Sequence, residues 1–412
     1  MNHTILPCAA ALLAASAPVL AQADHQEDDP QLVKWKDLLG KGSMLQLYGF
    51  LRTDVQYDDS RFNDPQIPGY VQSEDPTAPA SVGAMEDDSE FAVHARLTRL
   101  GLNLDGPAID GLGAPDLTGN VEIDFYNIGL NDNDSRSAIR MRRAFLNLDW
   151  GDWSLLAGQE WDVVSPLYPA VNHDLVMWGA GNLGDRRPQV RVQYDHALGP
   201  GNLTVTGGIG LSGAVDSPTV EGGLRAGENS GEPMVAARVG YSGKTKSGGA
   251  YQIGVSGHSS SEDFDPDGAG ALPEQDFDSS SISVDFKAPL HRDRWSVLGE
   301  WFSGKNLDDV RGGIFQGVNS TGGEIDSEGG WVELVFQATP NCSLHAGYSM
   351  DDPEDSDLDP DARSENDVAY LAARMKWGVF QAGVEYLNWT TKYVGLDDGD
   401  ANRVQIYLAY YF

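Results

Sequence analysis

The chain has 412 residues, and 62 acidic against 28 basic side chains give it a formal net charge of −34. This excess of acid disfavours nucleic-acid binding, because phosphate contacts are made mainly by Lys and Arg. A mean hydropathy of −0.35, with no apolar run of helix-spanning length after residue 23, excludes a helical membrane protein.

The chain opens on an apolar stretch over residues 5–20 that is followed by Ala21-Gln22-Ala23. This pattern predicts a secretory signal peptide over residues 1–23, cut after Ala23 or after Ala21; an N-terminal membrane anchor is the alternative. Residues 24–43 then form a short periplasmic segment. Cys342 is left as the sole cysteine of the mature chain, so no internal disulfide is expected.

Residues 44–412 contain sixteen candidate strands in which apolar and polar residues alternate with a period of two. In the last strand Val404, Leu408 and Phe412 share a face opposite Arg403 and Gln405. Two strands change phase midway, 91–105 and 138–149, which predicts bulges. The candidate strands are 44–57, 91–105, 118–128, 138–149, 153–164, 187–196, 201–211, 233–242, 249–259, 280–288, 294–304, 330–338, 342–350, 366–376, 379–391 and 402–412.

The connections alternate in length. Tight turns such as 150–152 and 339–341 follow even-numbered strands, and long, mostly acidic loops follow odd-numbered ones. Short turns on one rim and long loops on the other are typical of outer-membrane barrels, whereas a soluble β-sandwich, the alternative, has no reason to sort its loops. We therefore predict an all-β fold: a 16-stranded antiparallel transmembrane β-barrel with short periplasmic turns and long extracellular loops.

The third long loop, Ser165 to Arg186, is expected to fold inward and narrow the lumen. Its acids are Asp174 and Asp185 alone, whereas the first long loop, 58–90, carries nine. A segment packed inside a barrel should carry little charge, because an unpaired buried charge is costly. An ordinary external loop is the alternative.

Charged residues on the strands facing this loop are candidates for the pore lining. Arg140 and Arg142 share a strand face, so both can point into the lumen, and basic linings favour anions. Carboxylates at Asp285, Glu300, Glu333 and Glu385 are expected to form an opposite wall, so that a transverse field crosses the pore. Alternatively, the arginines pair with carboxylates across neighbouring strands. The full set of candidates is Arg52, Arg99, Arg140, Arg142, Arg143, Arg187, Arg191, Glu122, Asp124, Asp174 and Asp185.

The loop 260–279 matches the spacing of a twelve-position calcium loop. Its acids are Asp263, Asp265, Asp267 and Glu274, with a glycine at the sixth position. No flanking helices are expected, so we favour a solvated acidic loop with no bound cofactor, and calcium is the alternative.

Several segments resemble the DcaP-like outer-membrane porins, and parts of them also occur in general and phosphate-selective porins. The resemblance implies a trimer of 16-stranded barrels that admits small solutes, with small organic acids as the expected substrates. That family's N-terminal coiled coil has no counterpart in residues 24–43, so a trimer would rest on the barrel walls. The segments that carry the resemblance are 47–52, 98–102, 119–125, 139–145, 153–161 and the closing strand.

Together these features predict an outer-membrane porin, passively passing small hydrophilic solutes and preferring anions. Its expected partners are outer-membrane lipid, small solutes and two further copies of the chain, with no nucleic acid. No enzyme is indicated, because the dinucleotide-like run 208–213 lacks a following βαβ unit and no G-x-S-x-G elbow occurs. The alternatives are a barrel hydrolase of lipids and a plugged, adhesin-like surface barrel.

Overall fold

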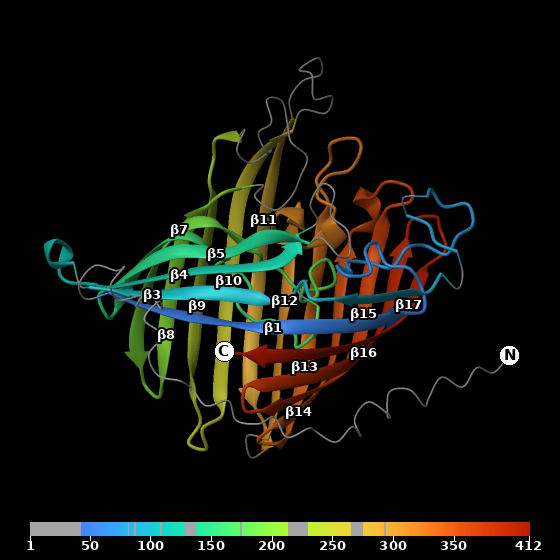
Figure 1. Cartoon of the computed structure of the whole chain (residues 1–412). Helices are drawn as coiled ribbons and strands as arrows, with labels where there is room; N and C mark the ends of the chain where they lie inside the picture. The colour runs from blue at the N-terminus through green and yellow to red at the C-terminus, as the bar shows by residue number, and fades with distance from the viewer. Residues whose placement is uncertain are drawn as a thin grey trace. The chain divides into compact units, whose positions relative to one another are not determined.

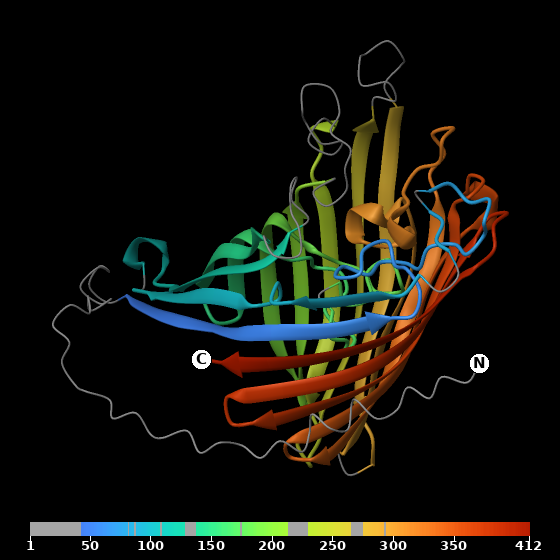
Figure 2. The same ribbon diagram turned by 45° about the vertical axis from the view of Figure 1, so that its right-hand side comes forward.

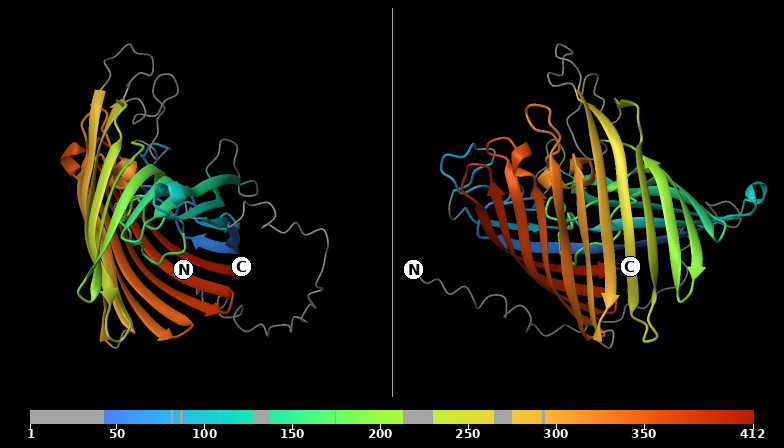
Figure 3. Two further views of the ribbon diagram at one scale, coloured as in Figure 1. Left: turned by 90° about the vertical axis from the view of Figure 1, so that its left-hand side faces the viewer. Right: turned by 180° about the vertical axis from the view of Figure 1, so that it is seen from behind.

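The computed structural model describes residues 43–412 except 81, 86–87, 108, 128–136, 174, 213–229, 265–274 and 292–293. Seventeen strand segments form one antiparallel sheet that closes where β1 pairs with β17. Because β2 and β3 follow one another along β1, they act as one wall strand, and the described chain forms a closed barrel of sixteen. Figure 1 and the two views of Figure 3 show these strands wrapping around a common lumen.

The strands agree with the predicted ones to within a few residues at most ends. In chain order they are β1 (Met44–Asp58), β2 (Glu90–His94), β3 (Arg99–Gly106), β4 (Asp116–Asn127), β5 (Ala138–Asp149), β6 (Trp153–Trp161), β7 (Arg186–Leu198), β8 (Gly201–Gly210), β9 (Met234–Lys244), β10 (Ala250–Phe264), β11 (Gln275–Pro289), β12 (Trp295–Lys305), β13 (Asp326–Thr339), β14 (Cys342–Pro353), β15 (Arg363–Trp377), β16 (Phe380–Tyr393) and β17 (Gly399–Tyr411).

The outer face of the wall is apolar and the inner face is polar. On β17, Val404 and Leu408 are 40% and 50% exposed, while Arg403 and Gln405 are buried. Such a surface suits lipid rather than water, because a soluble protein rarely exposes a continuous apolar band. No helix in the part of the chain that the structure describes is long and apolar enough to cross a membrane.

Both predicted phase changes are confirmed. The first is the break between β2 and β3, where residues 95–98 leave the ladder. The second lies between β4 and β5: Glu122 pairs with Arg143 and the next residue, Ile123, pairs with Met141. β5 therefore has one extra residue, Arg142, between these two pairs, and this bulge reverses the alternation along the strand. As a result the consecutive residues Arg142 and Arg143 both bond to inner-face carboxylates.

The alternation of loop lengths is also confirmed. Two or three residues link β5 to β6, β7 to β8, β13 to β14 and β15 to β16. The long connections 59–89, 162–185, 306–325 and 354–362 all leave the other rim. Among the described residues, these long connections are the segments with enough length to fold back into the lumen.

Candidate functional site

The inner loop, residues 162–185 between β6 and β7, lies inside the barrel (Figure 2). It crosses the inner face of the opposite wall, where three carboxylates accept its hydrogen bonds. Glu300 on β12 accepts from the Ser165 hydroxyl at 2.7 Å, Glu333 on β13 from the Ala170 amide at 2.7 Å, and Glu385 on β16 from the Asn172 amide at 2.7 Å. Two of these bonds reach the backbone, so the wall positions the loop largely independently of its side chains.

The two ends of the inner loop meet each other. The Asp162 amide donates to the Asp185 carbonyl at 2.8 Å, and the Asp185 amide donates to the Asp162 carboxylate at 2.9 Å. Burial raises the pKa of Asp162, although the Arg187 guanidinium opposes that rise. Burial also acts to raise the pKa of Asp185, but Arg311 and Arg186 outweigh it and the pKa is lowered. Both ends of the loop are therefore fixed by buried charge pairs.

Part of the first long loop also enters the lumen, which the sequence analysis did not predict. Phe62 and Val71 are buried, and they form one apolar cluster with Met177 of the inner loop and with Leu387 and Trp389 of β16. The nine acids of 58–90 suggested a loop wholly in water. The signal that could have revealed the inward part is the weakly charged stretch 65–72, where Ile67 and Val71 are buried.

The predicted arginines lie on the inner face, and most of them pair with carboxylates of neighbouring strands. Arg52 pairs with Asp54 (2.6 Å), Arg99 with Glu122 (3.7 Å), Arg140 with Asp124 (2.7 Å), Arg142 with Glu122 (2.8 Å) and Asp124 (2.9 Å), Arg143 with Glu160, and Arg187 with Asp162 (2.6 Å) and Asp309 (3.0 Å). Arg191 donates to the Trp161 carbonyl at 3.2 Å. Cross-strand pairing, the alternative, thus describes four of the seven arginines, whereas Arg52 pairs within its own strand and Arg187 pairs with two loop residues.

Pairing does not place the two charges at the same depth. The side chains of Arg99, Arg140 and Arg143, here called the lumen arginines, are 22%, 23% and 29% exposed. Their partners Glu122, Asp124 and Glu160 are 6%, 0% and 5% exposed. In each of these three pairs the arginine is therefore the more exposed partner, and the carboxylate is almost completely buried.

Other predicted residues are buried away from the lumen water. Arg187 is 0% exposed and Arg142 is 3% exposed, and Asp185 is also buried. Arg52 is 14% exposed, since its guanidinium bonds to the Asn172 carbonyl of the inner loop at 2.6 Å. Asp174 lies outside the described residues.

The predicted opposite wall of carboxylates needs correction. Glu300, Glu333 and Glu385 lie beneath the inner loop, where they bind it, and Asp285 pairs with Arg238 of β9 at 2.8 Å. These groups do not form a free acidic wall across the pore. The reason is that a loop entering a barrel brings unpaired amides, and buried amides need acceptors.

The proposed calcium loop cannot be placed, because Asp265, Asp267 and Glu274 and the Asp263 side chain lie outside the described residues. Within the ranges that the structure does describe, no group of three or more His, Cys, Asp or Glu side chains could hold a metal ion.

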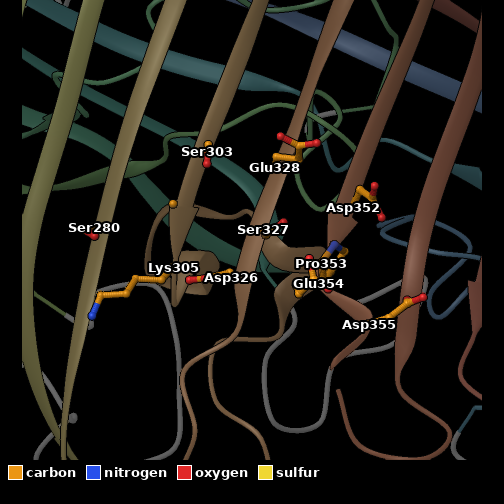
Figure 4. A pocket seen from close by; sticks show the side chains of 11 residues that line it. Ser280, Ser303, Lys305, Asp326, Ser327, Glu328, Asp352, Pro353, Glu354 and Asp355 are labelled. Atoms are coloured by element: carbon orange, nitrogen blue, oxygen red, sulfur yellow. The ribbon is translucent and has the colours of Figure 1, made fainter. Parts of the chain in front are cut away.

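A polar hollow of about 540 Å³ lies on the wall, outside the lumen (Figure 4). Its side chains Ser303, Lys305 and Glu328 belong to the outward-facing sets of β12 and β13, near the long-loop ends of those strands. Asp326, Asp352, Glu354 and Asp355 add further negative charge. The hollow shares no residue with the lumen arginines.

Comparison with known proteins shows which of them share this architecture. No protein-family model and no curated protein matches the chain. The DcaP outer-membrane channel of Acinetobacter baumannii matches with 19% identity and a TM-score of 0.66, over 90% of this chain and 98% of that chain. The chain has the porin fold. The sequence resemblance to DcaP-like porins is thereby confirmed at the level of the fold.

Two further porins agree with this assignment. An anion-selective porin from Comamonas acidovorans is 13% identical with a TM-score of 0.55, covering 90% of this chain and 100% of that chain. OmpF of Salmonella typhi is 11% identical with a TM-score of 0.55, covering 90% and 98%. At such identities the likeness concerns the backbone, so the selectivity of this porin fold has to be argued from its own residues.

Proposed function

We propose that this protein is an outer-membrane porin through which small hydrophilic solutes diffuse passively, with a preference for anions such as small organic acids. One observation supports the preference: in the pairs of the three lumen arginines, the arginine is the more exposed partner and the carboxylate is almost completely buried. A passing ion meets the nearer charge first, and at an effective dielectric of about 20 a unit charge at about 4 Å contributes about 4 kcal/mol before screening. The paired wall is then attractive to anions at short range.

The test replaces lumen arginines whose partners keep a second cation. Glu122 and Asp124 both remain paired with Arg142 when Arg99 and Arg140 are changed, so the double variant Arg99→Gln/Arg140→Gln leaves neither carboxylate unpaired. We expect its reversal potential in a salt gradient, measured in planar bilayers, to move toward cation preference. Entry of small dicarboxylates should slow more than entry of neutral sugars.

The matched control is Arg294→Gln, an exposed arginine at the turn before β12 that donates to the Ala338 carbonyl at 2.7 Å. Its effect should be small, since bulk salt screens an exposed charge. An unchanged ion preference in the double variant would remove the anion proposal. If the unaltered protein shows no conductance, the proposed porin function is contradicted.

One observation favours the plugged surface barrel as a second candidate. Parts of the loops 59–89 and 306–325 enter the lumen together with the inner loop, and their contact residues Phe62, Val71, Leu307 and Val310 are buried. If these loops fill the lumen, the protein would insert into bilayers without conducting. The same recordings therefore separate the two candidates.

We also propose that the chain is exported by its signal peptide, inserts in the outer membrane and assembles as a homotrimer through its barrel walls. The fold and its apolar outer face support the membrane part. Chemical cross-linking of intact outer membranes should give a ladder that ends at three copies, and a ladder that ends at one copy would contradict the trimer.

A further inference from the structure

Residues 306–325, between β12 and β13, form a second inner loop. It contains two short 3-10 turns, Leu307–Val310 and Gly313–Phe315, drawn in orange in Figure 2. Leu307 and Val310 are fully buried and form one apolar cluster with Val164 and Leu183 of the inner loop. The two loops thus share a core inside the barrel.

Charged groups join the two loops at two places. The buried Arg187 guanidinium contacts Asp162 of the inner loop at 2.6 Å and Asp309 of the second inner loop at 3.0 Å. Arg311 of the second inner loop pairs with Asp185 at 2.7 Å. Arg187 thus connects the Asp162 end of the inner loop to the second inner loop, and Arg311 connects the Asp185 end to it.

Backbone hydrogen bonds run between the same segments. The Gly179 amide donates to the Arg311 carbonyl at 2.8 Å, and the Gly184 amide donates to the Val310 carbonyl at 2.8 Å. Arg311 also lies over the Trp178 ring, at 5.4 Å from its centroid. These contacts, added to the shared core, make separate movement of either loop costly.

The second inner loop has wall contacts of its own. The Asp351 carboxylate on β14 accepts hydrogen bonds from the Gly313 amide at 3.2 Å and the Ile314 amide at 3.3 Å. Ser279 on β11 donates to the Asn306 carbonyl at 2.7 Å. Wall strands from β11 to β16 therefore hold the joined loops, because Glu385 on β16 binds the inner loop.

We propose that the two inner loops act as one layer that narrows the lumen, and that Arg187, Asp309 and Arg311 are positioning residues that set the size limit for solutes. This rests on the proposed porin function. Arg187, expected from the sequence to line the pore, instead acts from beneath by holding the loops. Loss of the charged contacts would let the layer move away from the lumen axis, while the lumen arginines keep their places.

The experiment uses Asp309→Asn, Arg311→Gln and the double variant in the full-length protein. Arg187 keeps Asp162 and the Leu211 carbonyl (2.9 Å) as partners in each, so the fold should tolerate them. Liposome swelling with neutral sugars of increasing size measures the limit directly. We expect a several-fold rise in the entry of the larger sugars relative to the smallest, an increased single-channel conductance and an unchanged reversal potential.

Asp285→Asn is the matched control, because Asp285 is as deeply buried and also pairs with an arginine, but its hydrogen bonds go to Arg238 and Gln252 on the wall. Because Glu300, opposite Asp285 on β12, keeps its own hydrogen bond from Ser165, this variant should leave the size limit unchanged. If the loop variants lower only the yield of folded barrel while the size dependence stays as in the unaltered protein, the residues are merely structural and this proposal is overturned. If the unaltered protein passes no sugar and no ions, the porin function fails as well.

Discussion

At the scale of single residues, burial depth decides what each charge does. Arg142 and Arg143 are consecutive, and the β4–β5 bulge turns both inward, yet Arg142 is 3% exposed and Arg143 is 29% exposed. Arg142 holds two carboxylates within the wall, whereas Arg143 is within reach of the lumen water. The period-two alternation predicts which face of the wall a residue lies on, but it does not predict how deeply the side chain is buried.

The Asp185–Arg311 pair gives a pH prediction at this scale. Because the pKa of Asp185 is lowered in the folded protein, the unfolded state binds more protons between that pKa and the ordinary value of about 4. The stabilisation is therefore complete above about pH 4 and is lost as the pH falls through the folded-state pKa. Arg311 is partly exposed, so the pair should contribute no more than about 1 kcal/mol.

We expect Asp185→Asn to lower the thermal unfolding temperature at pH 7 and to lower it by less at pH 2, because the stabilisation decreases once the pH falls below the ordinary pKa of about 4. Thermal unfolding in detergent, followed by the heat-modifiable shift on gels, checks this. A difference that is equally large at both pH values would mean that the variant acts through packing rather than through charge.

At the scale of elements, the strands were predictable and the inward part of the first long loop was not. Period-two alternation and the sorting of short and long connections follow from lipid on one face of the wall and solvent on the other, which constrains every strand. The entry of 59–89 into the lumen depends on a few apolar contacts, such as the edge-to-face pair of Phe62 and Trp389 at 5.2 Å. The seven acids of 59–89 hid this signal.

Phe62→Ala tests this element. Phe62 is 1% exposed, and truncation of a buried phenylalanine costs about 3–5 kcal/mol where the site cannot collapse. Because the barrel ladder does not involve Phe62, the loss should appear locally, as faster protease cleavage within 59–89 at an unchanged yield of folded barrel. The control is Met85→Ala, because the Met85 side chain is 74% exposed. The protease should cleave this variant at the same rate as the unaltered protein. Equal rates in all three proteins would place the loop outside the lumen.

At the scale of the whole molecule, the barrel depends on closure between strands that lie at opposite ends of the chain. β1 pairs with β17 from Phe50 opposite Tyr411 to Asp58 opposite Arg403. At the end of this seam the Arg403 guanidinium donates to the Asp58 carboxylate at 2.6 and 2.7 Å, and both side chains are almost completely buried. The alternation of the last strand predicted its two faces, but this ion pair could not be predicted, since sequence alone gives no register between strands so far apart.

The seam pair gives a prediction in the form of a double-mutant cycle. Removing one partner of a buried ion pair leaves an uncompensated charge and costs about 3–5 kcal/mol, whereas replacing both with apolar residues of similar volume is often neutral or stabilising. We therefore expect Arg403→Met to lower the temperature of heat modification strongly. Arg403→Met/Asp58→Leu should recover most of that loss, although the Pro65 carbonyl, which accepts from Arg403 at 2.7 Å, loses its donor. If the double variant is no more stable than Arg403→Met, the coupling energy is close to zero, and closure relies on the backbone ladder of β1 and β17 alone.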